Sequence, residues 1–258
     1  MRLAIIGTGY VGLVSGACFS EFGHEVTCVD INEATIAKLH AGEIPIYEPG
    51  LDDLVRRNAR SGRLQFTSNI AEGVRDAEAV FIAVGTPSRR GDGHADLSFV
   101  YAAAQQVAEA VTRPCVIVTK STVPVGTGRR IKEIVATVRP GFECDVASNP
   151  EFLREGSAIA DFMRPDRVVV GAETDRARDV LRRLYRPVAE NEAPIVFTGI
   201  ETAELTKYAA NAFLAMKVTF INEIADLCER AGADVHDVSR GIGLDERIGR
   251  RFLNPGPG

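Results

Sequence analysis

Short apolar runs alternate with amphipathic stretches over most of the chain. The runs are too short for helices, and those at 3–6 and 79–84 are continuously apolar, which is typical of strands buried on both faces of a sheet. We expect such strands at 3–6, 25–29, 79–84, 115–119, 145–148, 167–171 and 195–198. Helical periodicity fills the intervening stretches, at 10–22, 33–40, 51–59, 98–111 and 129–138, with one more helix between 171 and 195. The alternation predicts βαβ units with right-handed crossovers on a parallel sheet.

The pattern changes at Ile200, because no Pro or Gly interrupts the chain from there to Ala231. A shorter helix is expected at 235–240. The predicted fold is therefore α/β: a Rossmann-type doubly wound parallel sheet, followed by a long helix and a small helical segment. The expected domains are 1–199 and 200–258. Apolar residues recur along the long helix at helical spacing, at Leu205, Ala209, Ala212, Met216, Phe220, Ile224, Leu227 and Ala231. This stripe favours an interdomain or subunit interface over a helix that lies only on its own domain.

Composition adds constraints on class and compartment. The chain has 258 residues, with 45% hydrophobic and 25% charged, which is ordinary for a globular protein with a sizeable core. A net charge of −5 gives no reason to expect nucleic acid or an anionic membrane as a partner. No signal peptide or membrane-spanning run is recognisable. The five cysteines show no C-x-x-C pair and no His at metal spacing, so we expect reduced core thiols and no metal site. These features predict a cytoplasmic protein.

A glycine motif joins the first strand to the first helix. Gly7, Gly9 and Gly12 have the spacing G-x-G-x-x-G. In such a turn the first glycine permits the tight bend, the second lets the backbone approach a pyrophosphate, and the third lets helix and strand pack closely. The N-terminus of the helix, at Tyr10, then offers N–H groups and its positive dipole end to phosphate. Asp30 ends the next strand, where a carboxylate meets ribose hydroxyls and repels a 2′-phosphate. The motif therefore predicts NAD rather than NADP.

Other polar residues follow the ends of predicted strands, where a doubly wound sheet binds ligands. Thr122 follows the strand at 115–119. Taken by itself, its hydroxyl is better explained as a cap than as a chemical group. Glu151 and Glu155 are four apart on a turn, and paired carboxylates suit proton transfer or the placement of a water molecule. Capping of a helix by Asn149 and Glu151 is the alternative interpretation of this pair.

Three polar residues also lie on one face of the long helix. Glu204, Lys207 and Asn211 have the spacing i, i+3 and i+7. Lys207 and Asn211 interrupt an otherwise apolar neighbourhood, which favours a chemical role. The spacing alone fits a solvated face equally well.

Several longer motifs occur along the chain in a fixed order: GTGYVG, IPIYEPGL, VGTP, KSTVPVGT, NPEFLREGSA with PDRVVVG, and ELTKYAANAF. In this order they resemble the UDP-glucose 6-dehydrogenases, and the resemblance covers the whole chain. GDP-mannose 6-dehydrogenases look similar, but GTP and PDRVVVG fit the UDP-glucose branch better. A different class, a module that binds NAD and dimerises without turnover, also remains open.

The resemblance implies a two-step oxidation of the C6 alcohol of UDP-glucose to UDP-glucuronate, with NAD as the cofactor, in polysaccharide biosynthesis. Arg247 resembles an arginine that reaches the substrate of the partner subunit in this family, and the apolar stripe predicts a homodimer formed through the long helix. Thr122 and Glu151 would place water and move protons, and Lys207 and Asn211 would steady oxyanions. The NAD site would contain Gly7, Thr8, Gly9, Tyr10, Val11, Gly12, Asp30, Val84, Gly85, Thr86, Pro87, Ser121, Thr122 and Glu155. The sugar nucleotide would contact Glu151, Phe152, Leu153, Arg154, Glu155, Lys207, Asn211 and Arg247.

The chain departs from the family's pattern at two places. Thr35 stands where the family often has Lys or Arg near the NAD ribose, which puts one NAD contact in doubt. In the family a segment like 252–258 leads into G-G-S-C-F-P-K-D, which supplies the nucleophilic cysteine, and a UDP-binding domain follows. Neither is in the printed sequence. We therefore expect these 258 residues by themselves to bind NAD without turnover.

Overall fold

The computed structural model describes residues 1–257. Gly258, the last residue of the predicted second domain, lies outside the described residues. The chain forms two compact units, Met1–Leu205 and Thr206–Gly258, and the division falls inside the long helix.

One sheet organises the first unit. Within residues 1–257 it has eight strands, in the order β3-β2-β1-β4-β5-β6-β7-β8. The first six strands in this spatial order pair in parallel, β7 is antiparallel to β6, and β8 is parallel to β7. This is the doubly wound order, so the predicted fold class is confirmed. The strands are Arg2–Ile6 (β1), Glu25–Val29 (β2), Leu64–Thr67 (β3), Ala79–Ile82 (β4), Val116–Thr119 (β5), Asp145–Ser148 (β6), Val168–Ala172 (β7) and Ile195–Thr198 (β8).

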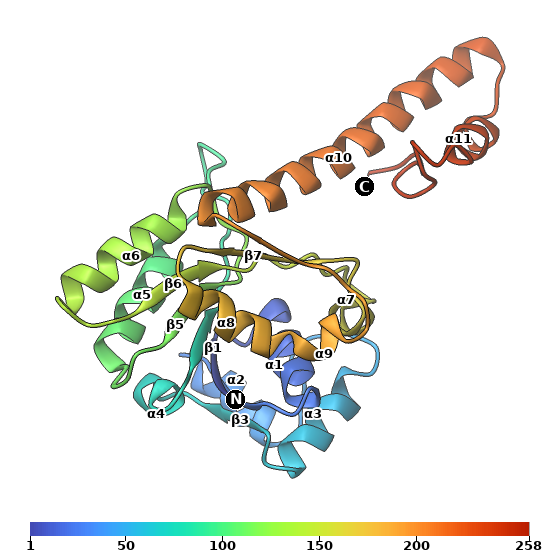
Figure 1. Cartoon of the computed structure of the whole chain (residues 1–258). Helices are drawn as coiled ribbons and strands as arrows, with labels where there is room; N and C mark the ends of the chain where they lie inside the picture. Colours follow the sequence, from blue (N-terminus) through green and yellow to red (C-terminus); the bar gives the residue numbers. More distant parts are fainter. Residues whose placement is uncertain (258) are drawn as a thin grey trace. The chain divides into compact units, whose positions relative to one another are not determined.

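Helices cover both faces of this sheet (Figure 1). Leu3 and Ile5 of β1 belong to one core, with α1, α3, α7 and α8, whereas Ala4 and Ile6 belong to the other, with α4, α5 and α6. Successive strand side chains point to opposite faces, so β1 is apolar and buried at residues 3–6, after the exposed Arg2. The helices of this unit are Tyr10–Glu21 (α1), Glu33–His40 (α2), Leu51–Arg60 (α3), Ile70–Val74 (α4), Ser98–Ala110 (α5), Thr127–Val138 (α6), Ala158–Met163 (α7), Asp175–Leu184 (α8) and Arg186–Ala189 (α9).

Four short elements were not predicted: β3, α4, α7 and the four-residue α9, which follows the one helix expected between 171 and 195. β3 alternates between buried and exposed side chains, so it lacks a continuous apolar run. α4 has 5 residues and α7 has 6, which is too short for helical periodicity to be recognised.

The predicted parallel direction does not hold for β7, nor for β8, which runs parallel to β7. Ser148 of β6 pairs with Gly171 of β7 in antiparallel register. A parallel return would need a crossover that carries the chain back to the other end of β6. The connection between β6 and β7 contains only the short α7 and remains at the carboxyl end of β6, so β7 starts from that end.

The second unit contains most of α10 (Ile200–Ala231) and α11 (Val235–Gly243). The predicted bounds of the long helix are reproduced, and α11 runs beyond the predicted 240. The segment after α11 folds back on α10: the Lys217 ammonium donates to the Ile248 carbonyl at 2.8 Å, and Asn222 exchanges two hydrogen bonds of 2.8 Å with the Gly256 backbone. Part of the predicted apolar stripe remains exposed, with Met216 at 55% and Leu227 at 59%. Among the described residues, no helix combines the length and apolarity that a bilayer crossing requires.

Candidate functional site

The turn between β1 and α1 has the geometry that its glycines predict. Gly7 has a φ of 101°, in the left-handed region. A Cβ on Gly12 would lie 2.0 Å from the Gly7 carbonyl oxygen, so only glycine fits there. A Cβ on Gly9 would meet no described atom within 4 Å, so this backbone faces open space. Gly9 is also the N-cap of α1, and no side chain in the described part of the chain caps it. The turn therefore fits a pyrophosphate bound at the helix N-terminus.

Asp30 is held beside this turn. Its Oδ2 accepts the Thr8 backbone N–H at 2.8 Å and the Thr8 hydroxyl at 2.7 Å. Its Oδ1 accepts the Asn32 N–H at 3.0 Å. These bonds fix the carboxylate at the carboxyl end of β2, next to the glycine turn. Thr8, predicted as an NAD contact, uses its hydroxyl here to orient Asp30.

The loops after β4 and β5 are joined by two hydroxyls. Ser121 donates from Oγ to the Val84 carbonyl at 2.7 Å, and Thr86 donates from Oγ1 to the Thr122 carbonyl at 3.0 Å. The structure therefore brings the predicted NAD segments 84–87 and 121–122 together. Thr122 is half-buried at this junction.

A buried polar network that sequence reasoning missed lies beside these loops. The Lys120 ammonium, 3% exposed, donates to Asn149 Oδ1 at 3.1 Å and to the Tyr185 hydroxyl at 3.4 Å. The Tyr185 hydroxyl donates to the same Asn149 oxygen at 2.5 Å, and burial raises the pKa of Tyr185. Asn149 Nδ2 donates to the Val169 carbonyl at 2.8 Å. The sequence offered one sign of this network, because the polar residues Lys120 and Asn149 directly follow buried strands.

The predicted carboxylate pair lies on the loop after β6. Glu151 is half-buried, and its Oε2 accepts the Leu153 backbone N–H at 2.6 Å. Glu155 is exposed on the same loop. The two carboxylates thus differ in environment: Glu151 is half-buried and bonded to the Leu153 backbone, whereas Glu155 is exposed.

Two other predicted substrate contacts have partners within the chain. Arg154 binds Asp161 at two points, with Nε to Oδ2 at 3.0 Å and Nη2 to Oδ1 at 2.5 Å. The Arg167 guanidinium lies 3.8 Å from the ring centroid of Phe152. These contacts order the loop between β6 and β7.

Glu204, at the start of α10, caps α6 rather than facing solvent. It is 2% exposed, and its two oxygens accept the N–H groups of Gly126 and Gly128, each at 2.7 Å. Burial raises the pKa of Glu204, and these two donors act against that shift. α6 begins directly after the loop that carries Thr122, so Glu204 fixes the far end of that loop.

The remaining predicted residues belong to the second unit. Lys207 is 7% exposed, whereas Asn211, one turn along α10, is exposed. Arg247 is exposed and pairs with Asp245 at 2.6 Å.

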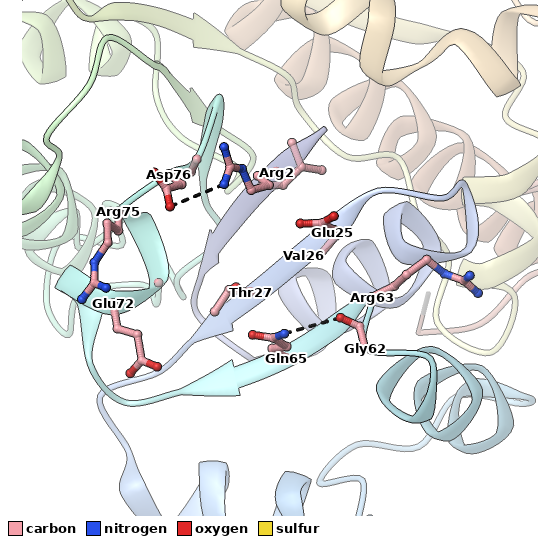
Figure 2. Close-up of a pocket in the computed structure, with 13 residues that line it drawn as sticks. Arg2, Glu25, Val26, Thr27, Gly62, Arg63, Gln65, Glu72, Arg75 and Asp76 are labelled. Atoms are coloured by element: carbon pink, nitrogen blue, oxygen red, sulfur yellow. Dashed lines mark hydrogen bonds and ion pairs between the residues drawn. The ribbon is translucent and has the colours of Figure 1, made fainter.

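One cavity of about 190 Å³ does not coincide with these residues. Figure 2 shows its polar lining, which includes Arg2, Thr27, Gln65 and Glu72. Asp76 also lines the cavity and pairs with Arg2 at 3.5 Å. Arg2 begins β1, whereas the glycine turn follows the other end of that strand, so this cavity is separate from the predicted NAD site.

Comparison with known proteins assigns both parts of the chain. Residues 1–189 match the NAD binding domain of the UDP-glucose/GDP-mannose dehydrogenase family, and residues 201–258 match its central domain. The chain belongs to this family. The family match and the glycine turn agree, so the prediction of NAD as cofactor is confirmed.

Individual members of the family are similar over the whole chain. UDP-glucose 6-dehydrogenase of Rhizobium meliloti is 60% identical over 260 residues, which are 100% of this chain and 60% of that protein. UDP-glucose 6-dehydrogenase TuaD of Bacillus subtilis is 52% identical over 258 residues, 100% of this chain and 55% of that protein.

Solved structures of the family also superpose well. A UDP-glucose dehydrogenase from Pyrobaculum islandicum has a TM-score of 0.95 at 45% identity, over 100% of this chain and 60% of that one. A GDP-mannose dehydrogenase from Pseudomonas aeruginosa has a TM-score of 0.92 at 35% identity, over 99% and 60%. The chain thus spans 55% to 60% of the length of the curated relatives named above.

Proposed function

We propose that this protein is part of a UDP-glucose 6-dehydrogenase, which oxidises UDP-glucose to UDP-glucuronate in two hydride transfers at C6. The observation that carries the proposal is 60% identity, over the whole chain, to a UDP-glucose 6-dehydrogenase. The identity to the GDP-mannose dehydrogenase structure is lower, at 35%, which favours UDP-glucose over GDP-mannose. We retain the division into an NAD-binding domain at 1–199 and a helical region at 200–258 as part of this proposal.

The residues divide into four groups by proposed role. NAD, which accepts hydride when bound, would be held by the glycine turn, Asp30 and the loops at 84–87, 121–122 and 155. Thr122 and Glu151 would place water and carry protons. The ammonium of Lys207 and the amide of Asn211 would stabilise oxyanions as they develop, because donors aimed in advance at such charge need no reorganisation. The sugar nucleotide would lie against 151–155, with Arg247 reaching the substrate of a partner subunit.

We propose that none of the five cysteines in these 258 residues is the nucleophilic thiol of the reaction. Cys115 and Cys144 precede β5 and β6, at the ends of the strands away from the predicted site. Cys28 lies within β2, and burial raises its pKa to about 12, so it is a poor nucleophile. Cys18 and Cys228 are buried in helices. We therefore propose that this chain by itself binds NAD but does not complete the oxidation.

Turnover measurements on two forms of the protein test this. NAD binding to the 258-residue chain is measured by calorimetry, and NADH released per sugar by absorbance, for this chain and for the protein with its full family length. We expect binding without turnover in the first, and two NADH per UDP-glucose in the second. Faster turnover of GDP-mannose would favour the alternative substrate. No turnover by the longer form with either sugar would favour a module that binds NAD and dimerises.

We also propose a homodimer formed through α10. The support is that Met216, Phe220 and Leu227 are about half exposed on one chain, which costs free energy unless a partner covers them. Sedimentation at micromolar concentration should give a dimer, and Phe220→Asp should shift it toward monomer. A well-folded monomer in the parent protein would contradict this part of the proposal.

We further propose a cytoplasmic protein that supplies UDP-glucuronate for polysaccharide biosynthesis. The five cysteines within the described residues are free thiols, which fits a reducing compartment. Cell fractionation and analysis of surface polysaccharide in a deletion strain test these two statements.

A further inference from the structure

Three segments far apart in the sequence meet around one buried carboxylate. Glu48 is 4% exposed, and its Oε2 accepts both the Tyr10 hydroxyl and the Gly156 backbone N–H, the latter at 2.9 Å. Its Oε1 accepts the Ile159 N–H at 3.4 Å. The Gly156 N–H also reaches the Tyr10 oxygen at 3.2 Å, so these groups form one connected network.

The network joins two of the segments assigned to the NAD site. Tyr10 is the first residue of α1, directly after the open backbone of Gly9. Gly156 directly follows Glu155, in the same loop before α7. Glu48 itself lies in the connection between α2 and α3, and it was not among the predicted site residues. One side chain from outside the site therefore fixes the glycine turn relative to the loop after β6.

The hydrogen-bonding groups of this network stabilise one arrangement of the connection. A buried carboxylate is costly unless donors surround it, and Glu48 has three donors, two of them backbone N–H groups that cannot titrate. Burial and the hydrogen bond to Glu48 raise the pKa of Tyr10 to about 12. The Tyr10 hydroxyl therefore remains a donor at neutral pH.

We propose that Glu48 is a positioning residue of the NAD site: through Tyr10 and Gly156 it sets the separation between the glycine turn and the Glu155 loop. The proposal rests on the proposed function, because it takes both segments as NAD contacts. Glu48 need not touch NAD itself. Removing the Glu48 carboxylate should weaken NAD binding even in a protein that still folds. The glycine turn and the Glu155 loop would then have to become ordered when NAD binds, which costs binding free energy.

The test compares NAD affinity and thermal unfolding in the 258-residue chain. Glu48→Ala should weaken NAD binding about tenfold or more, and Tyr10→Phe, which removes one oxygen, should weaken it about fivefold. Glu48→Gln should restore part of the affinity lost in Glu48→Ala, because the amide oxygen still accepts a hydrogen bond. Glu43→Ala, an exposed carboxylate in the same connection, is the matched control and should bind NAD like the parent.

The outcomes separate this proposal from the proposed function. If the parent chain binds NAD, and Tyr10→Phe and Glu48→Gln are folded and bind it equally well, Glu48 is only a structural tether and the proposal is wrong. If Glu48→Ala does not unfold cooperatively, the other two variants still decide. If the folded parent chain itself does not bind NAD, the proposed NAD site fails, and the positioning role fails with it.

Discussion

The carboxylate of Glu204 accepts the backbone N–H of Gly128 at 2.7 Å, and its second oxygen accepts that of Gly126 at the same distance. These bonds join the start of α10 to the N-terminus of α6, directly after the Thr122 loop. Glu204→Ala would leave two N–H groups without this acceptor and should cost about 2 kcal/mol or more in the free energy of unfolding. Glu201→Ala, which removes the exposed ion pair with Arg129, should cost less than about 1 kcal/mol. Equal losses in urea unfolding would contradict the capping role.

Two glycines of the same turn should respond differently to alanine. At Gly12 the added Cβ would lie 2.0 Å from a backbone oxygen, so Gly12→Ala should destabilise the fold by about 3 kcal/mol. At Gly9 it would meet no described atom within 4 Å, so Gly9→Ala should melt like the parent. Gly9→Ala should nevertheless lose NAD affinity, because its Cβ enters the space assigned to the pyrophosphate. Melting curves and calorimetry check both statements, and normal NAD binding by Gly9→Ala would place the pyrophosphate elsewhere.

The choice between NAD and NADP should depend on the charge of Asp30. Asp30→Asn keeps an oxygen that can accept from Thr8 but removes the charge, whereas Asp30→Ala removes both. We expect the parent to bind NAD more tightly than NADP. In both variants the difference between the two affinities should be smaller. Asp30→Ala should also weaken NAD binding more than Asp30→Asn, because the glycine turn loses its anchor. Equal affinities for the two cofactors in the parent protein would remove this interpretation.

His24 should make stability depend on pH. Burial lowers the pKa of His24, and its hydrogen bond to the Leu184 carbonyl acts against that shift. The folded protein therefore binds fewer protons than the unfolded chain below the ordinary histidine pKa of about 6.5. The stability due to neutral His24 is fully present above that pH and is lost as the pH falls through the folded-state pKa.

Urea unfolding between about pH 7 and about pH 5 measures this effect. His24→Gln should flatten the dependence in that window. His94→Gln, at an exposed loop position, is the control and should leave the slope unchanged. If His24→Gln keeps the pH dependence of the parent's free energy of unfolding, that dependence is due to other groups.

In the protein of full family length, alanine substitutions at two lysines of α10 should have different effects, one on catalysis and the other on stability. Lys207→Ala should lower kcat about a hundredfold, more than it weakens NAD binding, because its charge matters most as oxyanions develop. Lys217→Ala should instead lower the melting temperature, because its ammonium bonds the Ile248 and Gly249 carbonyls. Steady-state kinetics with both variants measure the contrast. An unchanged kcat in Lys207→Ala would exclude the oxyanion role.

The sequence determined the features that depend on neighbours along the chain. The runs at 25–29, 145–148 and 195–198 are strands with the predicted bounds. The central strands β4 and β5 are buried at every position, as expected for strands covered on both faces of the sheet. The helix at 200–231 formed with its predicted bounds, because an uninterrupted stretch of helix formers needs no tertiary information to be recognised. Gly7 and Gly12 had their roles fixed by the bend and the close packing that only glycine permits.

Tertiary structure alone decided which distant residues meet. The antiparallel direction of β7 followed from the path of the chain over the sheet edge, for which no local pattern exists. The sequence did not indicate that Glu48 and Glu204 would be buried. Each is buried because backbone N–H groups from remote segments converge on it. A carboxylate can be buried only when the fold brings it such donors, and the sequence does not state which donors those are.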